Sequence, residues 1–280
     1  MANVSKIPTF LAALTAVLAA NANASSIATV PIRIVGTEAP VIMVRVQGRE
    51  LPLQLDLGDA SSLVIHPEVL ATLHAEPTGK FFKGFSMDGA IETPIVAVKN
   101  VEIGSLTFQA VDARRDAHDE AFLLAKKTGV GAVGFIGTGL LNSGQIRLDY
   151  PRKMLTISIP GADGQVRNLC RGKPIPFLLN KYGFGTSVST DIGELQLGWD
   201  TGAPAVLISA STATAARLPT DQESIVSKKF AIAGRNYGPQ LIEVWRNIPL
   251  PPEIPGLIGH TFFEKRTVCF DYPRAKLHIQ

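Results

Sequence analysis

Gly134-Phe135-Ile136-Gly137 recurs in this chain of 280 residues as Gly256-Leu257-Ile258-Gly259. The segment Leu148-Asp149-Tyr150-Pro151-Arg152 recurs likewise as Phe270-Asp271-Tyr272-Pro273-Arg274. The residue numbers of both pairs differ by the same offset of 122. A constant offset over two separate motifs indicates an internal duplication, which has to be recognised before a fold is assigned. The sequence therefore predicts two related halves.

A second pair of segments places one aspartate in each half. The first contains Asp56-Leu57-Gly58 and leads into an apolar strand at 63–65, and the second contains Asp200-Thr201-Gly202 and leads into 207–208. These aspartates are 144 residues apart, against 122 for the glycine motifs, so the first half holds 22 more residues between them. An inserted loop or a longer hairpin that includes part of 113–128 would accommodate this difference.

Most of the remaining sequence favours β-structure. Short apolar stretches alternate with Gly, Pro and Asn, as in 41–46 and its following turn at 47–50, a pattern typical of barrels and sandwiches. The best helix candidates are 117–127 in the first half and 209–218 in the second. We predict an all-β protein with minor helix, divided into an N-terminal lobe at 25–165 with Asp56 and a C-terminal lobe at 166–280 with Asp200.

The first 24 residues have the pattern of a secretory signal peptide. Lys6 precedes a short apolar run at 10–20, and Ala22-Asn23-Ala24 is a small-x-small cleavage site. No other apolar stretch approaches the roughly 20 residues of a membrane span, so no stable membrane insertion is expected. The predicted location is periplasmic or secreted.

Charge and cysteine content add little constraint on function. The formal net charge is +3 without long runs of one sign, so nucleic acid is not an expected partner. The two cysteines, Cys170 and Cys269, allow a single disulfide in an exported protein. Two buried thiols remain the alternative, because sequence alone does not place the two Cα atoms within disulfide reach.

The repeat places one carboxylate, Asp56 or Asp200, at an equivalent position in each half. Gly58 and Gly202 let the backbone turn closely beneath each aspartate. If the halves pack about a pseudo-twofold axis, Asp56 and Asp200 meet. Two like charges at short distance share one proton, so that one carboxyl group serves as an acid and the other as a base.

The second half resembles one lobe of an aspartic peptidase of the pepsin/retropepsin superfamily, on the basis of Asp200-Thr201-Gly202-Ala203 and the later Leu257-Ile258-Gly259. The first half resembles the other lobe, on the basis of Asp56-Leu57-Gly58 and Phe135-Ile136-Gly137. The closing Asp-Tyr-Pro-Arg strands are similar to the lobe ends of bacterial members. The resemblance covers about 32–279 and implies a two-lobed acid-protease fold with duplicated β-barrel lobes.

The resemblance also implies an activity, the hydrolysis of a peptide or protein substrate by a water held between Asp56 and Asp200. Gly58, Thr201 and Gly202 would support the two loops, and neither a metal nor an organic cofactor would be needed. Both lobes lie in one chain, so a monomer would suffice. A flap is expected within 81–90, with Phe85, Met87 and Asp88 as candidates; an ordinary surface hairpin is the alternative.

Two residues depart from the family pattern. The family has Thr or Ser directly after each catalytic aspartate, where the hydroxyl bonds across to the other lobe, but this chain has Leu57 in the first half. Asp59 is also unusual and would add repulsion near the pair. Two functions therefore remain: an aspartic endopeptidase, or a catalytically impaired relative that binds peptides or a partner protein without cleavage.

Other motifs favour structural roles. The glycine pattern at 129–134 matches a dinucleotide fingerprint but does not open a clear helix. The five histidines are scattered, and no Cys-x-x-Cys or His-x-x-x-His pair suggests a metal site. Asp149 and Asp271 precede Tyr-Pro-Arg at equivalent positions and are expected to cap that turn or to pair with Arg152 and Arg274.

Overall fold

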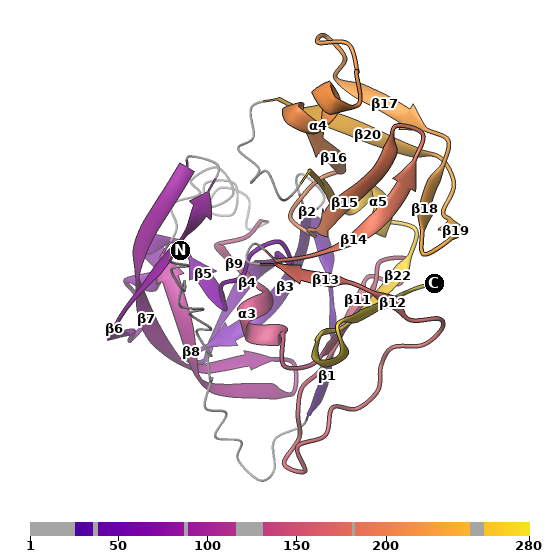
Figure 1. The fold of residues 1–280 in the computed structure, drawn as a ribbon. Coiled ribbons are helices and arrows are strands. Elements are labelled where there is room, and N and C mark those ends of the chain that lie inside the picture. The colour runs from indigo at the N-terminus through magenta and orange to yellow at the C-terminus, as the bar shows by residue number, and fades with distance from the viewer. Residues whose placement is uncertain (1–25, 36–38, 87–88, 116–130, 181–182, 247–254) are drawn as a thin grey trace, which may run out of the picture.

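The computed structural model describes residues 26–35, 39–86, 89–115, 131–180, 183–246 and 255–280. These residues form three β-sheets with a few short helices, so the prediction of an all-β protein with minor helix is confirmed. Figure 1 shows one sheet system in each half of the chain and a third sheet that contains strands from both. The predicted signal peptide at 1–24 and the predicted helix at 117–127 lie outside the described residues.

The first lobe is an eight-stranded sheet with the order β2-β3-β4-β9-β5-β8-β7-β6. Its strands are β2 (Arg33–Val35), β3 (Ala39–Val46), β4 (Arg49–Leu55), β5 (Leu63–Ile65), β6 (Glu76–Ser86), β7 (Gly89–Ile103), β8 (Leu106–Arg115) and β9 (Gly134–Ile136). β3 pairs with β7 as well as with β4, which curls the sheet on itself. Apolar side chains of β3 and β4 alternate toward the core, as the sequence pattern indicates.

The second lobe repeats this arrangement in a nine-stranded sheet with the path β17-β20-β16-β21-β15-β14-β18-β19, to which β13 adds beside β14. Its strands are β13 (Leu178–Asn180), β14 (Gly183–Thr190), β15 (Gly193–Trp199), β16 (Val206–Ser209), β17 (Ser224–Ser227), β18 (Phe230–Ile232), β19 (Arg235–Asn236), β20 (Gln240–Trp245) and β21 (Gly256–Ile258). The order β20-β16-β21-β15 corresponds to β8-β5-β9-β4 of the first lobe.

The third sheet is shared by the two halves. It has six strands in the order β1-β11-β10-β22-β23-β12, with bounds β1 (Ile27–Pro31), β10 (Gln145–Asp149), β11 (Met154–Ser158), β12 (Ile175–Pro176), β22 (Thr267–Asp271) and β23 (Lys276–Ile279). The predicted division between residues 165 and 166 falls in the segment between β11 and β12. That division stays a prediction.

At the centre of the shared sheet, the two repeated strands pair with each other. β10 and β22 are the repeated strands, and they pair antiparallel with Arg147 directly opposite Cys269. Residue 269 is also the position that corresponds to 147 in the second repeat, because the offset is 122. Each of these two residues therefore pairs with its own counterpart, and a pseudo-twofold axis passes between them.

The strand pairing locates the extra residues of the first half. β5 pairs in parallel with β8, with Val64 beside Arg114, and β16 pairs in parallel with β20, with Ile208 beside Val244. The first pair is separated by 50 residues and the second by 36, so 14 of the 22 extra residues lie between positions 64 and 114, the interval that contains the β6–β7 hairpin. The other eight lie between positions 114 and 137. Both intervals agree with the expectation of an inserted loop or a longer hairpin that includes part of 113–128.

The helices among the described residues are short and lie at strand ends. They are α1 (Pro67–Leu70), α3 (Thr138–Leu141), α4 (Ala210–Ala215), α5 (His260–Phe263) and the 3₁₀ turn η1 (Tyr272–Arg274). α4 lies within the helix predicted at 209–218, and the Ser209 hydroxyl caps it by accepting the Thr212 N–H at 3.2 Å. In the part of the chain that is described, no helix has both the length and the hydrophobicity needed to cross a membrane.

A disulfide and an aromatic cluster hold the second lobe to the shared sheet. Cys170 and Cys269 form a disulfide with their Cα atoms 5.4 Å apart, which decides between the two alternatives that the sequence left open. It ties the segment between the lobes to β22. Beside β22, Trp199 is buried edge-on against Phe262 and Phe263.

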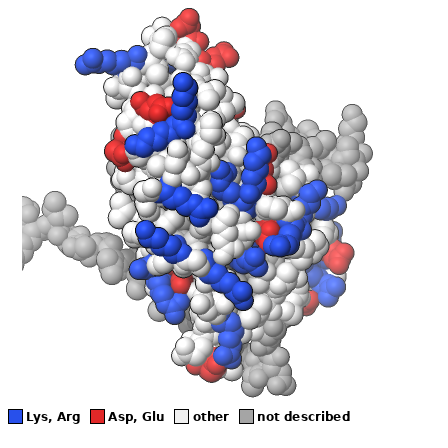
Figure 2. Space-filling model, turned by 90° about the vertical axis from the view of Figure 1, so that its right-hand side faces the viewer, with Lys and Arg blue, Asp and Glu red and all other residues white. Residues whose placement is uncertain are grey.

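Charge is spread over the surface. Figure 2 shows the right-hand side of Figure 1, where Lys and Arg side chains extend along the whole face and acidic groups lie between and above them. Two exposed arginines pair with buried carboxylates, Arg152 with Asp149 and Arg274 with Asp271.

Candidate active site

Each aspartate of the two motifs stands directly after a central strand of its lobe. Asp56 follows β4 and donates its backbone N–H to Ile136 O at 2.9 Å, and Asp200 follows β15 and donates to Ile258 O at 3.1 Å. In both lobes the acceptor strand runs parallel to the strand before the aspartate. The same backbone geometry thus presents both carboxyl groups.

The second glycine of each repeated motif lies beneath the aspartate loop. A Cβ atom at Gly137 would stand 2.5 Å from Asp59 O, and one at Gly259 would stand 2.4 Å from Ala203 O. Both contacts are shorter than any real Cβ contact, so a side chain is excluded at either position. The packing that the resemblance implied between these motifs is present in both lobes.

The two carboxyl groups meet across the lobes. A Cβ atom at Gly58 would lie 2.6 Å from Asp200 Cγ, and one at Gly202 would lie 3.1 Å from Asp56 Cγ. The two carboxyl groups are close enough for each to shift the pKa of the other. Each also accepts a backbone N–H of its own loop, from Gly58 at 2.9 Å and from Gly202 at 2.7 Å. The structure therefore brings together four of the predicted site residues.

The environment of the two carboxyl groups favours a shared proton. Burial raises the pKa of Asp56 well above its ordinary value, and the charges of Asp200 and Asp59 raise it further. Burial also raises the pKa of Asp200, but hydrogen bonds from Asp56 and from the N–H groups of Gly202 and Ala203 oppose that rise. Asp200 accepts two backbone N–H groups and Asp56 accepts one, so hydrogen bonding favours the negative charge on Asp200 and the shared proton on Asp56. Both residues remain partly exposed to solvent.

Thr201 braces the pair from one side. Its buried hydroxyl accepts the Leu57 N–H at 3.0 Å and donates to Leu55 O at 2.6 Å, so it connects the second loop to the backbone of the first. Leu57, the equivalent residue of the first loop, is 1% exposed and has no hydroxyl. The brace between the lobes is therefore one-sided.

Asp59 does not stand as an isolated negative charge beside the pair. Arg114 Nη2 lies 2.9 Å from Asp59 Oδ2, and its side chain is only 5% exposed. The expected repulsion from Asp59 is thus countered by a buried guanidinium. Sequence reasoning missed Arg114, because β8 ends with Asp112, Arg114 and Arg115, and nothing in this charged run marks Arg114 as the buried one.

The predicted flap falls on the β6–β7 hairpin, the longest in the molecule's described part. Phe85 lies near the end of β6, where its backbone pairs with Ala90. Met87 and Asp88 lie outside the described residues. The choice between a flap and an ordinary surface hairpin stays open.

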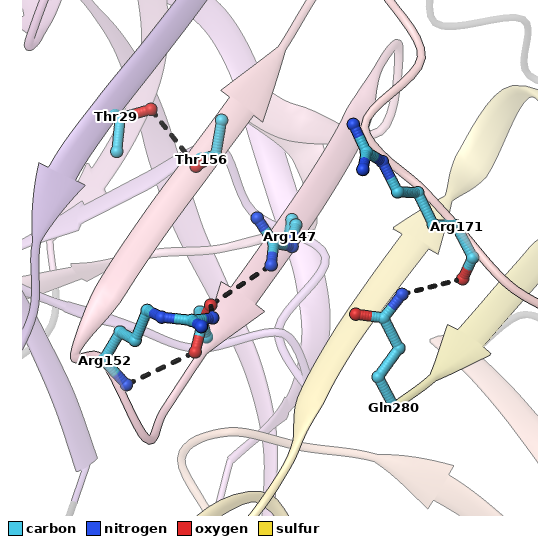
Figure 3. A network of polar contacts seen from close by, with 7 residues as sticks. Thr29, Arg147, Arg152, Thr156, Arg171 and Gln280 are labelled. Carbon is cyan, nitrogen blue, oxygen red and sulfur yellow. Dashed lines mark hydrogen bonds and ion pairs between the residues drawn. The ribbon is translucent and has the colours of Figure 1, made fainter.

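Asp149 and Asp271 lie apart from the pair and have the structural role that the sequence predicted. Asp149 binds Arg152 at 3.0 Å and Arg147 at 3.2 Å, and Asp271 binds Arg274 at 2.8 Å. Figure 3 shows the side chains of Arg147 and Arg152 close to one another. Burial alone would raise the pKa of Asp149, but hydrogen bonds and charge from Arg152 lower it below its ordinary value. Among the residues with described positions, no cluster of His, Cys, Asp or Glu could hold a metal ion.

No family model and no curated protein matches this chain. Solved structures do match, and one of them is the crystal structure of an aspartic proteinase from Irpex lacteus. That match has a TM-score of 0.55 and 13% sequence identity, and it covers 90% of this chain and 96% of the other. At such low identity the likeness concerns the fold alone. The chain has the two-lobed fold of an aspartic proteinase.

Proposed function

We propose that this protein is an aspartic endopeptidase that cleaves polypeptides with Asp56 and Asp200. The observation that carries the proposal is the contact between the two carboxyl groups, each seated over the glycine of the opposite loop. Two carboxyl groups in such an environment share one proton, which is the requirement for acid–base catalysis on an amide. The fold likeness to an aspartic proteinase supports the same activity.

The unequal surroundings assign the two roles. Asp200, which accepts two backbone N–H groups, is the carboxylate that removes a proton from the attacking water. Asp56, whose pKa is raised further, gives its proton to the carbonyl oxygen. The water oxygen bonds to the carbonyl carbon and a neutral tetrahedral diol forms. Its collapse breaks the C–N bond, Asp200 protonates the leaving nitrogen, and the proton of one diol hydroxyl returns to Asp56.

A binder that does not cleave is the second candidate, and Leu57 is the observation that favours it. The first loop has no hydroxyl to bond across to the second lobe, so half of the brace is absent. Misplacement of a catalytic group by about 1 Å can cost about a hundredfold in rate. The site around the carboxyl pair would then bind a peptide or a partner protein without hydrolysing it.

Cleavage assays separate the two candidates. The chain from Ser25 onward is incubated with a diverse peptide mixture from acid to neutral pH, and the products are read by mass spectrometry. We expect cleavage by the wild type and none by Asp56→Asn or Asp200→Asn, while the exposed Asp163→Asn serves as the matched control. Cleavage that persists in Asp200→Asn contradicts the mechanism. A folded wild type that cuts nothing but retains peptides favours the binder.

We further propose that the protein acts outside the cytoplasm, in the periplasm or secreted, and as a monomer. The signal-like residues 1–24 support export, and the Cys170–Cys269 disulfide supports it independently, since such bonds persist in oxidising compartments. Both carboxyl groups come from one chain, so a second copy is not needed to complete the site.

A further inference from the structure

The two aspartate loops can be compared position by position. Asp59 and Ala203 each stand three residues after their aspartate. Arg114 and Val244 also correspond, because each pairs in parallel with the residue eight positions after that aspartate. The first lobe therefore has a buried ion pair where the second lobe has alanine and valine. The same loop is the one with Leu57 in place of the hydroxyl residue.

Arg114 is fixed on several sides. Its Nη2 bonds Asp59 Oδ2 at 2.9 Å and its Nε donates to Ser61 Oγ at 2.9 Å. Its guanidinium lies 4.7 Å from the ring centre of Phe82 in β6 and 5.5 Å from that of Phe135 in β9. Such stacking adds to the hydrogen bonds of a planar guanidinium in a way that lysine does not reproduce. One side chain on β8 thus connects the aspartate loop with two other strands of the lobe (Figure 1).

Asp59 carries this attachment into the loop itself. Its Oδ1 accepts the Ser61 N–H at 2.6 Å, and its carbonyl oxygen accepts both the N–H and the hydroxyl of Thr138, at 2.8 and 2.9 Å. Ala203 shares only the backbone part of this pattern, since its carbonyl accepts the His260 N–H at 2.9 Å. The first loop is therefore anchored within its own lobe by side chains that the second loop lacks.

We propose that Arg114 is a positioning residue: through Asp59 it holds the Asp56 loop within the first lobe and so replaces the interlobe hydroxyl bond that Leu57 does not make. Thr201 connects the two loops across the lobes, and the ion pair adds an attachment of the first loop within its own lobe. Where activity is the readout, this inference rests on the proposed function.

The pair also sets the charge beside the carboxyl groups. The groups that face them are Asp59 with its partner Arg114 and, next to Asp200, the buried Tyr150. The charge of Asp59 raises the pKa of both Asp56 and Asp200. A guanidinium that is always protonated offsets this charge, and lysine would keep the charge without the fork. Charge and anchorage can therefore be varied separately.

The second lobe supplies the matched substitutions. Arg114→Val introduces the residue of the second lobe that corresponds to Arg114, and Asp59→Ala introduces the one that corresponds to Asp59. The double variant carries both substitutions and so has the valine and the alanine of the second lobe together. ¹³C NMR of the Asp carboxyl carbons follows the titration of the pair without any need for activity. We expect Arg114→Val to raise the apparent pKa values by about one unit, Asp59→Ala to lower them, and the double variant to return them near wild type. Values that stay unchanged in both single variants would overturn the electrostatic part.

The anchoring of the Asp56 loop is tested by adding Leu57→Thr to the double variant and asking whether it restores the lost properties. In the double variant we expect kcat to fall about tenfold or more with little change in KM, and amide exchange at Leu57 and Gly58 to accelerate. Adding Leu57→Thr should restore both in that background and give no gain in the wild type. Arg114→Lys should keep the wild-type titration and lose kcat. An equal effect of Leu57→Thr in both backgrounds, or a double variant with wild-type exchange and kcat, would overturn the proposal.

The two proposals fail in different ways. If the wild type cuts no peptide, the proposed function fails, while amide exchange and titration still report whether the ion pair anchors the loop. If the wild type cuts and the double variant behaves like it, the function stands and the positioning role fails. The double variant leaves no buried charge unpaired, so its folding does not depend on the Arg114–Asp59 contact.

Discussion

The carboxyl carbon of Asp200 lies 2.6 Å from the point that a Cβ atom would occupy at Gly58, a residue of the other lobe. Gly202 stands in the reciprocal relationship to Asp56 at 3.1 Å. Each carboxyl group thus packs against the glycine backbone of the opposite loop. The close approach of the two acids depends on the absence of a side chain at both positions.

The first prediction concerns the packing of the Asp200 carboxyl group against Gly58. Gly58→Ala forces the Asp200 carboxyl group away, so we expect the rate of peptide cleavage to fall about a hundredfold or more with the fold retained. Gly48→Ala is the control, because Gly48 has φ +82° and open space around it. It should lower stability by backbone strain and leave cleavage intact. A Gly58→Ala variant with normal activity would show that the pair tolerates displacement.

A second prediction concerns the one-sided brace. Thr201→Val keeps the shape of the side chain but leaves the buried Leu57 N–H and Leu55 O without their partner. We expect the free energy of unfolding in urea to fall by about 2–4 kcal/mol and kcat to fall with it. Thr201→Ser retains the hydroxyl and is the matched control. Equal stability of the Val and Ser variants would mean that these hydrogen bonds contribute little.

The pH dependence of stability provides a third prediction. An unfolded aspartate titrates near about 3.9, and the folded pKa of Asp56 is raised well above its ordinary value. The folded protein then binds a proton that the unfolded chain has released, so this contribution is complete below the unfolded pKa and is lost as pH rises through the folded one. We expect the free energy of unfolding to decline from about pH 4 upward, and cleavage to decline over the same rise.

Asp56→Asn tests the assignment, because an amide does not titrate. Its unfolding free energy should depend less on pH than that of the wild type, while Asp163→Asn should follow the wild-type curve. Parallel curves for the wild type and Asp56→Asn would place the shared proton elsewhere.

The disulfide yields a fourth prediction. Cys170 and Cys269 are 99 residues apart in sequence, and closing a loop of that size contributes about 4–5 kcal/mol in the chain-entropy account. We expect Cys170→Ser with Cys269→Ser to lower the Tm by on the order of 10 °C. Cleavage at low temperature should persist, because the bond lies on the shared sheet and not at the carboxyl pair. Loss of cleavage in a folded double variant would contradict this separation.

Features that occur in both halves of the chain could be predicted from the sequence. The constant offset of the two motifs indicated the paired lobes, and the strand before each aspartate placed Asp56 and Asp200 at equivalent points. Features present in one lobe only were harder to find. Arg114 meets Asp59 only because β5 and β8 pair in a particular register, and a single sequence does not determine the register of distant strands.

The place of the extra residues needed the strand pairing for a related reason. The sequence offset gave their number, but only the pairing of β5 with β8 and of β16 with β20 divides them between 64–114 and 114–137. The disulfide was likewise undecidable from the sequence, since only the fold brings Cys170 to β22.

The unequal aspartate loops give the site a direction. Were the lobes identical, a polypeptide could lie across the pair either way round, and both orientations would react alike. Here the surroundings differ, because Asp200 accepts two backbone N–H groups and Asp56 accepts one. Under the proposed function Asp56 protonates the scissile carbonyl oxygen, and this role selects one of the two orientations. Substrate chains should therefore run from N-terminus to C-terminus in a single direction across the pair.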